Sequence, residues 1–328
     1  KQKFKIEYLE KTGLTIVGEN NYQADRFRGR VMFPIHNLSG KVTAFGGRVM
    51  KTDAKTAKYL NSPESEIYHK SRIVYGIFHA KQEIVKQDRY YLVEGYTDVL
   101  SMHQTGITNV VASSGTALTP DQIRLISRFT ANITVLYDGD NAGIKASLRG
   151  IDLILTEGMN VNVLLLNDGD DPVSFARKHT EEEFIQYIRN NETDFIKFKT
   201  GLLLKDAEND PVKRAGLIQD IVGSITIIPN PILRSLYVKE CSTLMKVEEQ
   251  VLYNEIAKLQ RNKLDKERFV PTAQQQSPTA QPAPEVSVSN SKDSSEIEER
   301  EMMRYFMKYC DEFLITEAAD ESTPGINV

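Results

Sequence analysis

Acidic residues at two points of the chain have the types and spacing expected of a divalent-cation site. Glu94 follows the apolar run 90–93, and Asp138 and Asp140 follow the β-prone run 133–137. Parallel strands end at one edge of a sheet, so we expect these acids to converge there. Carboxylate oxygens suit Mg²⁺, and such ions stabilise the attacking and leaving oxygens in phosphoryl transfer. The pattern therefore indicates metal-assisted phosphate chemistry, although an Asp-Gly-Asp segment alone is more typical of a turn after a strand.

The elements that must position these acids follow from the periodicity of the chain. Between residue 88 and about residue 171, strand and helix patterns alternate, and Thr119 before Pro120 is a plausible N-cap. The expected strands are 90–93, 109–112, 133–137 and 161–166, and the expected helices are 97–104, one from Pro120 onward, and 142–157. This alternation predicts a parallel sheet covered by helices.

The flanking segments have different patterns. Residues 1–24 read as a helix and a turn around Gly13, residues 25–50 as a hairpin, 51–76 as loop, and 77–87 as a helix. Residues 180–262 have helical apolar spacing without strand signals and break at 229–231. Residues 270–297 are polar and contain prolines, so they cannot form a core, and an amphipathic helix begins near Glu296.

Composition narrows the class of protein. The 328 residues, 40% of them apolar and 26% charged, suit a soluble protein of two or more domains, and no apolar run is long enough to span a membrane. Cys241 and Cys310 have no zinc-site spacing and fit a reducing cytoplasm. Residues 1–80 contain 14 Lys and Arg against 7 Asp and Glu, whereas the remainder contains 27 against 38. A basic N-terminal third suggests a polyanion track, although lysines that only solubilise a surface would give the same count.

The combination of strand-Glu-Gly with strand-Asp-x-Asp-x-x-Gly about 40 residues later resembles the Toprim domain of topoisomerases, bacterial primases, some nucleases and recombination mediators. The segments before this pattern indicate which of these families the chain resembles most. The runs 25–48, Lys58-Tyr59-Leu60-Asn61-Ser62-Pro63-Glu64, Tyr68-His69-Lys70-Ser71-Arg72 and Tyr75-Gly76 closely resemble the catalytic core of bacterial DNA primase, in the correct order. The resemblance covers roughly residues 1–260.

By this resemblance, the metal-binding residues are Glu94, Asp138, Asp140 and Asp171, and the first three are the catalytic acids. They would hold two or more Mg²⁺ or Mn²⁺ ions, and we expect no zinc in this chain. Glu94 could bind metal or act as a base. Asp171 precedes the proline of a family motif in which an aspartate follows the proline. Here Val173 takes that place, which removes one possible metal ligand.

The resemblance also implies a basic ridge that holds template and nucleotide, formed by Arg30, Arg48, Lys58, Asn61 and Lys70. Arginine offers a planar fork to phosphate oxygens, and lysine offers a flexible point charge. Tyr59 could stack on a base or simply pack. Asp98, one turn beyond Glu94, could support the metal site or be a helix-start residue.

The implied fold is α/β, with a Toprim parallel-sheet domain flanked by a basic N-terminal α+β subdomain and a C-terminal helical subdomain. The expected boundaries are 1–87, 88–177, 178–262, a linker at 263–297, and 298–328 as the start of a truncated helicase-binding domain. Because the chain begins with Lys1, we expect a segment upstream of it.

The implied activity is that of a DNA primase, a DNA-directed RNA polymerase that starts short RNA primers on single-stranded DNA. Its implied partners are the template, ribonucleoside triphosphates and, through the C-terminal domain, the replicative helicase. We expect a cytoplasmic monomer without membrane contact. The alternatives are DNA cleavage by a Toprim nuclease or topoisomerase, and a non-catalytic binding module.

Overall fold

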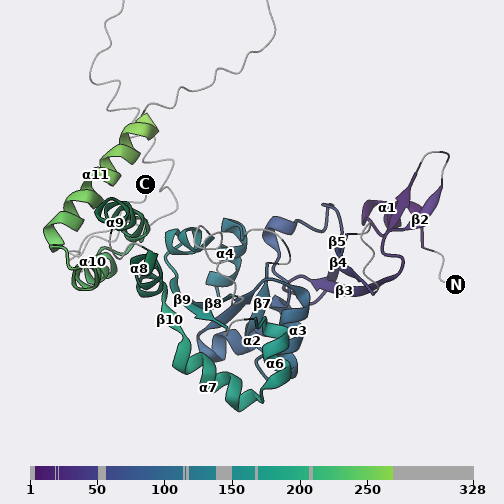
Figure 1. Cartoon of the computed structure of the whole chain (residues 1–328). Helices are drawn as coiled ribbons and strands as arrows, with labels where there is room; N and C mark the ends of the chain where they lie inside the picture. Colours follow the sequence, from purple (N-terminus) through teal and green to yellow (C-terminus); the bar gives the residue numbers. More distant parts are fainter. Residues whose placement is uncertain are drawn as a thin grey trace, which may run out of the picture. The chain divides into compact units, whose positions relative to one another are not determined.

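The structure is a computed structural model that describes residues 4–18, 20, 22–50, 57–113, 115, 118–137, 150–166, 169–206 and 210–268 (Figure 1). The chain divides into units at residues 1–270 and 271–328, and the second unit lies outside the described residues. The predicted linker beyond residue 268 and the predicted segment 298–328 therefore also lie outside them. Among the helices that are described, none is both long and apolar enough to cross a membrane.

The chain begins with a helix and a short hairpin. Helix α1 (Ile6–Lys11) ends in a turn at Gly13, whose φ is +68°, as the sequence predicts. Strands β1 (Thr15–Val17) and β2 (Gln23–Asp25) then pair antiparallel. This hairpin was not predicted, because three-residue strands are too short to show clear periodicity.

Three antiparallel strands form a second small sheet, which we call the N-terminal sheet. It consists of β3 (Arg30–His36), β4 (Val42–Val49) and β5 (Tyr59–Asn61) in the order β3-β4-β5. The predicted hairpin is confirmed, and its turn is closed by Asn37, whose Oδ1 accepts hydrogen bonds from the backbone of Ser39 and Lys41 at 3.0 Å each. Strand β5 lies in a segment predicted as loop. It pairs with only three residues of β4.

A five-stranded sheet, the central sheet, forms the middle of the chain in the order β10-β9-β8-β6-β7. Strands β7 (Val110–Ala112), β6 (Tyr90–Val93), β8 (Asn132–Tyr137) and β9 (Asn160–Leu165) are parallel, as predicted. The short edge strand β10 (Thr193–Asp194) pairs antiparallel with β9. This strand corrects the prediction that residues 180–262 contain no strand.

Helices cover both faces of the central sheet, because alternate residues of each buried strand point to opposite sides. Tyr90 and Leu92 pack in one core with α2 (Ile77–Gln87), α4 (Pro120–Ser127) and the helical residues 150–156. Tyr91 and Val93 pack in a second core with α3 (Tyr96–Gln104), α6 (Pro172–Lys178) and α7 (Glu181–Asn191). Phe33, Ile35 and Ala44 of the N-terminal sheet join this second core.

The remaining described helices form the predicted helical region. They are α8 (Phe195–Asp206), α9 (Pro211–Thr226), α10 (Pro231–Met245) and α11 (Glu249–Arg268), and they extend the first core. The predicted break at 229–231 is confirmed, since Asn230 caps α10 and Pro231 starts it. Helix α11 continues to Arg268, so the linker predicted from residue 263 begins too early. No glycine or proline occurs before Pro271 to stop the helix.

Candidate active site at the carboxyl edge of the central sheet

Glu94 lies where the sequence places it, directly after β6 at the carboxyl edge of the central sheet. Leu92 is level with Val135 of β8, so the parallel register puts Glu94 level with Tyr137. The Glu94 side chain is exposed, and none of the ion pairs found among the described residues involves it. An exposed carboxylate that is outside these ion pairs fits the predicted role of a hard ligand for a divalent ion.

Asp138 and Asp140 lie outside the described residues, as does Asp168. Asp138 directly follows Tyr137, the last residue of β8, which the register places beside Glu94. The convergence of Glu94 with Asp138 and Asp140 stays a prediction, because both aspartates lie outside the described residues. Within the described part of the chain, no three His, Cys, Asp or Glu side chains form a metal-binding group, and two of the four predicted ligands are outside that part.

The turn after Glu94 is fixed by a helix-start hydrogen bond. Asp98 Oδ2 accepts the backbone N–H of Gly95 at 2.8 Å, at the beginning of α3. This geometry favours the helix-start interpretation of Asp98. It also fixes the backbone that carries Glu94, since Gly95 is its direct neighbour.

Asp170 and Asp171 lie after β9, and Asp171 is one of the predicted metal ligands. Asp171 is the N-cap of α6, and its Oδ1 accepts the Ser174 N–H at 2.6 Å. Asp170 is 8% exposed and accepts hydrogen bonds from Lys178 Nζ at 2.6 Å and Ser174 Oγ at 2.8 Å. These bonds, that of Lys178 first, lower the pKa of Asp170. Asp170 is thus committed to an ion pair, and the cap uses one of the two Asp171 oxygens.

Tyr96, two residues after Glu94, joins this edge to the N-terminal sheet. Its hydroxyl donates to Asn61 Oδ1 at 2.8 Å, and its ring stacks on Phe33 with centroids 5.1 Å apart. A Cβ at Gly46 would come within 2.5 Å of this ring, so only glycine allows the close approach of β4. Asn61, a predicted template- or nucleotide-binding residue, is therefore hydrogen-bonded to the segment that carries Glu94.

Arg48 and Lys58 gather around one aromatic ring. Arg48 lies directly opposite Tyr59 in the β4–β5 register. The Arg48 guanidinium is 5.6 Å from the ring centroid of Tyr59, and the Lys58 ammonium is 5.9 Å from it. Tyr59 itself is 6.3 Å from Tyr96, centroid to centroid, and packs against the second core. Arg48 thus lies on the same sheet face as Tyr59 and Asn61, and the ammonium of Lys58 lies near the same ring.

Arg30 lies on the opposite face of the N-terminal sheet. It pairs with Val49, whereas Val31 pairs with Arg48, and neighbouring residues in a strand point to opposite faces. Its Nη1 donates to the carbonyl oxygens of Gly47 at 3.2 Å and Ala57 at 2.9 Å. The structure therefore separates Arg30 from Arg48, although the sequence grouped them in one ridge. Arg30 holds the backbone of β4 and the start of β5.

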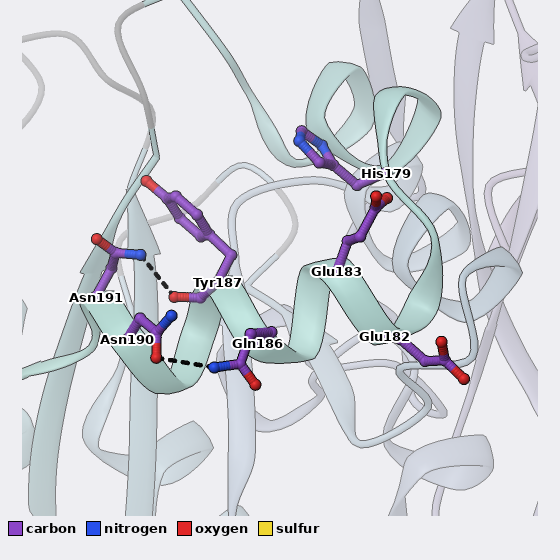
Figure 2. Close-up of a pocket in the computed structure, with 7 residues that line it drawn as sticks. All are labelled: His179, Glu182, Glu183, Gln186, Tyr187, Asn190 and Asn191. Carbon is purple, nitrogen blue, oxygen red and sulfur yellow. Dashed lines mark hydrogen bonds between the residues drawn. The ribbon is translucent and has the colours of Figure 1, made fainter.

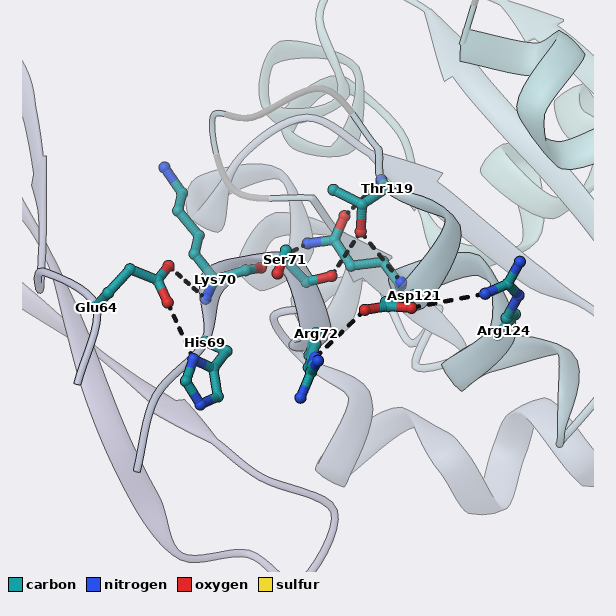
Figure 3. Close-up of polar contacts among 9 residues, drawn as sticks. Glu64, His69, Lys70, Ser71, Arg72, Thr119, Asp121 and Arg124 are labelled. Carbon is teal, nitrogen blue, oxygen red and sulfur yellow. Dashed lines mark hydrogen bonds and ion pairs between the residues drawn. The ribbon is translucent and has the colours of Figure 1, made fainter. Parts of the chain in front are cut away.

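Lys70 lies in the 3-10 turn η2 (Lys70–Arg72), which is bound to the start of α4 (Figure 3). The backbone N–H of Lys70 donates to Glu64 Oε1 at 2.9 Å, and its carbonyl accepts from Gln122 Nε2 at 3.0 Å. The next residues return to the central sheet, because Tyr75 and Ala112 of β7 exchange backbone hydrogen bonds of 2.9 and 3.0 Å. Lys70 is thus tethered to the strand beside β6.

A separate hollow of about 520 Å³ lies along α7 (Figure 2). Its amides bond within the helix, where Gln186 donates to Asn190 at 3.0 Å and Asn191 to the Tyr187 carbonyl at 2.8 Å. None of the predicted site residues lines it. The lining residues are His179, Glu182, Glu183, Gln186, Tyr187, Asn190 and Asn191.

Sequence reasoning missed Tyr96 and Gln122. The role of Tyr96 is only weakly indicated by the sequence, because an aromatic residue that begins a helix after an acidic residue is common. Gln122 stands three residues after Thr119, the spacing of a capping box, and the structure contains that box. The long-range bonds of Gln122 to Lys70 have no signature along the chain.

Family models match three parts of the chain. The N-terminal domain of the DNA primase catalytic core matches residues 1–81, and a Toprim-like model matches residues 91–176. The DnaB-helicase binding domain of primase matches residues 204–250. This last match falls on α9 and α10 and not on 298–328, where a helicase-binding segment was expected.

Known proteins of the same kind are similar over most of the chain. The DNA primase of Clostridium acetobutylicum is 39% identical over 258 residues, which are 77% of this chain but 41% of that primase. A DNA primase domain from Pseudomonas aeruginosa has a TM-score of 0.70 and 32% identity, covering 77% of this chain and 79% of that one. A DnaG primase catalytic domain bound to single-stranded DNA has a TM-score of 0.64 and 35% identity, covering 72% and 77%.

These matches agree with the geometry of the edge. The Toprim-like match covers the parallel strands of the central sheet except Tyr90, together with Glu94, and the primase-specific N-terminal match covers Arg48, Asn61 and Lys70. The chain spans about two fifths of the length of the full-length relative from Clostridium acetobutylicum. On sequence and fold together, the chain belongs to the bacterial DNA primases and corresponds to their catalytic core.

Proposed function

We propose that this chain synthesises short RNA primers on single-stranded DNA, as the polymerase core of a bacterial replication primase. The observation that carries the proposal is the connection through Tyr96. It joins the segment of Glu94, an exposed carboxylate at the sheet edge, to Asn61 on the face that carries Arg48 and Tyr59, whose ring also lies near the ammonium of Lys58. Nucleotidyl transfer needs both parts, since the acids hold a cation and the cations hold phosphates.

In this proposal Glu94, Asp138, Asp140 and Asp171 hold two or more Mg²⁺ or Mn²⁺ ions. When bound, such ions neutralise the triphosphate and favour attack of a 3′-hydroxyl on the α-phosphate. Arg48, Lys58, Asn61 and Lys70 bind template or nucleotide, and Tyr59 presents its ring beside two of these cations. Arg30 is retained as a weaker member, because its Nη1 already bonds to backbone carbonyls.

The test is incorporation of labelled ribonucleotides on unprimed single-stranded DNA with Mg²⁺ or Mn²⁺. We compare the chain with Glu94→Gln and with Glu182→Gln, a control that removes an exposed carboxylate from α7. Short RNA that is lost only in Glu94→Gln supports the proposal. Nicking of the DNA without RNA synthesis would move the function to the nuclease alternative.

For the organisation of the chain we keep the proposed divisions at residues 87 and 177, and we place the start of the linker after Arg268. We further propose that the core acts as a monomer in the bacterial cytoplasm. The experiments would be limited proteolysis for the boundaries and light scattering for the mass in solution.

A helicase partner is part of the proposal, and α10 is the surface we assign to it. The helicase-binding family model covers this helix. Ile232 is 73% exposed and Leu236, one turn later, is 61% exposed. A hollow of about 460 Å³ continues from Leu236 along the helix to Leu244. Adjacent exposed apolar side chains of this size are typical of a protein-binding surface.

Binding of a bacterial replicative helicase tests this assignment. Leu236→Asp should weaken capture, and Val85→Asp, a control on α2 where the valine is 57% exposed, should not. Truncation after residue 270 separates the two candidate regions. Loss of capture on truncation, with Leu236→Asp unaffected, would place the helicase contact in residues 271–328.

A further inference from the structure

The start of α4 holds the turn that carries Lys70 through its backbone carbonyls (Figure 3). Gln122 Nε2 donates to the carbonyls of Lys70 at 3.0 Å and Ile73 at 2.9 Å. Thr119 Oγ1 donates to the carbonyl of Ser71 at 2.5 Å. Three carbonyls within four residues are therefore bound from one helix end.

The Gln122 amide is used completely by these contacts. Its two donors go to the Lys70 and Ile73 carbonyls, and its Oε1 accepts the Thr119 N–H at 3.1 Å. Gln122 is fully buried, and a buried amide that lost one of these partners would carry a desolvation cost. The three bonds together therefore specify one position of η2 relative to α4.

The other side of Lys70 is held as well. Its backbone N–H donates to Glu64 Oε1 at 2.9 Å, while Glu64 Oε2 lies 3.2 Å from His69 Nδ1. Lys70 is thus fixed at both of its peptide groups. The Tyr75–Ala112 bridge then ties the segment to β7, in register with Val93 just before Glu94.

The cationic side chains around this turn differ in whether they pair with a carboxylate. Arg72 Nε pairs with Asp121 at 3.3 Å, and Arg124 pairs with Glu157 at 2.8 Å. Lys70 as a residue is half-buried, and in the described part of the chain no carboxylate pairs with its ammonium. In Figure 3 this side chain extends away from the carboxylate of Glu64. The neighbouring arginines are therefore paired with carboxylates, and Lys70 keeps its charge available for a ligand.

We propose that Gln122 is a positioning residue that acts through Lys70. By fixing the Lys70 carbonyl, it keeps the ammonium at the carboxyl edge of the central sheet, where it binds a phosphate group. That phosphate belongs either to the nucleoside triphosphate or to the template. This inference deepens the proposed function and rests on it for the role of Lys70. A fixed backbone raises the affinity of a flexible lysine for its ligand, because the lysine then loses less conformational freedom on binding.

A double-mutant cycle on the whole chain tests the inference. The variants are Gln122→Met, Lys70→Ala and the pair of them, with Met chosen to keep length without donors. Two binding arms are measured, the affinity for a labelled oligo-dT strand and the affinity for Mg²⁺-ATP, together with KM and kcat of primer synthesis. We expect Lys70→Ala to lower one of these two affinities about tenfold, and Gln122→Met to lower the same affinity about threefold. The double variant should match Lys70→Ala, and the arm that responds identifies the phosphate.

Asn109→Leu is the matched control. Asn109 is also buried, and its Nδ2 donates to a backbone carbonyl, that of Arg89, at 3.0 Å. It precedes β7 at the opposite end of the sheet, so it should lower the melting temperature without changing either affinity. This comparison separates a loss of stability from a loss of positioning.

An effect of Gln122→Met that persists in the Lys70→Ala background would overturn the inference, as would binding that Lys70→Ala leaves unchanged. The binding arms do not require catalysis. If the wild-type chain binds but makes no primer, the proposed function fails, while coupling between Gln122 and Lys70 in either arm still supports the positioning role.

Discussion

At the amino edge of the central sheet polar groups bond to one another, whereas at the carboxyl edge Glu94 is exposed and outside every ion pair of the described residues. Asp88 accepts from Thr130 Oγ1 at 2.8 Å and from Asn132 Nδ2 at 3.1 Å. Asn132 Oδ1 in turn accepts from Asn160 at 2.8 Å, just where β8 and β9 begin. These bonds tie the starts of the strands together.

The carboxyl edge has the same kinds of residues in a different arrangement. Its polar bonds hold backbone in place, as Asp98 does for Gly95 and Gln122 for Lys70. They leave the charges of Glu94 and Lys70 without partners in the described structure. The difference shows how one sheet can be both stable and reactive. A charged side chain that hydrogen-bonds to other protein groups supports the fold, whereas one that is held by its backbone alone remains available for a ligand.

The largest expected effect is at the carboxyl edge. Glu94→Gln and Asp138→Asn should each lower the rate of primer synthesis by about 100-fold or more, because charge stabilisation by a bound metal contributes several kcal/mol. The double variant should lose little beyond the worse single variant, since ligands of one site act as a unit. Steady-state rates of all three variants measure this.

Glu94→Gln should leave the stability of the protein almost unchanged. Glu94 has no ion pair among the described residues, so Glu94→Gln should shift the free energy of unfolding by less than about 0.5 kcal/mol. A large destabilisation would mean that Glu94 serves the fold, and the contrast between the two edges would disappear.

The opposite result is expected at the amino edge. Asp88→Ala removes the acceptor of Thr130 and Asn132 and places alanine at a φ of +47°. We expect a loss of about 1–2 kcal/mol in the free energy of unfolding, from the hydrogen bonds and the left-handed backbone. Primer synthesis per folded molecule should stay within about twofold of wild type. Urea unfolding and primer-synthesis rates, measured on one preparation, compare the loss of stability with the loss of activity. An equal fall of stability and of activity per folded molecule would contradict a purely structural role for Asp88.

The contrast extends to the two arginines of the N-terminal sheet. Arg48 lies beside Tyr59 and we expect it to contact a phosphate, so Arg48→Ala should weaken binding of single-stranded DNA several-fold and lower its salt slope by about 0.7. Arg30→Ala should instead lower stability, because Arg30 bonds to carbonyls of Gly47 and Ala57. Binding titrations at several salt concentrations decide this, and equal salt slopes for the two variants would contradict the separation by sheet face.

The sequence predicts the main elements of this fold because their signals are local. Apolar spacing placed α2 at residues 77–87 and β6 at residues 90–93, and both bounds agree with the structure. Thr119 before Pro120 gave the start of α4 by its capping chemistry. The strands β5 and β10 were not predicted, because strands of three and two residues are too short to show an alternating pattern.

For the site, the sequence indicated which residues belong to the family pattern but not how each is held. Arg30 and Arg48 look alike along the chain, and only the pairing register shows that they face opposite ways. Tyr96 bonds to Asn61 across 35 positions, and Gln122 bonds to Lys70 across 52, so no local pattern reports either contact. Contacts between segments far apart in the chain therefore require the fold.

The smallest effect at neutral pH is expected for Tyr90, the first residue of β6. Its side chain is fully buried, and burial raises the pKa of its hydroxyl. Its contact with Met159 Sδ, at 4.0 Å, is weak, so Tyr90→Phe should change the free energy of unfolding by less than about 1 kcal/mol at pH 8. In the unfolded chain a tyrosine releases its proton near pH 10, whereas the folded protein keeps it. The stability that this group contributes is therefore complete below about pH 10 and falls as the pH rises further. Wild type should lose more stability than Tyr90→Phe between pH 8 and pH 10.5 in urea unfolding, and equal losses would mean that water reaches the hydroxyl at the amino edge of the sheet.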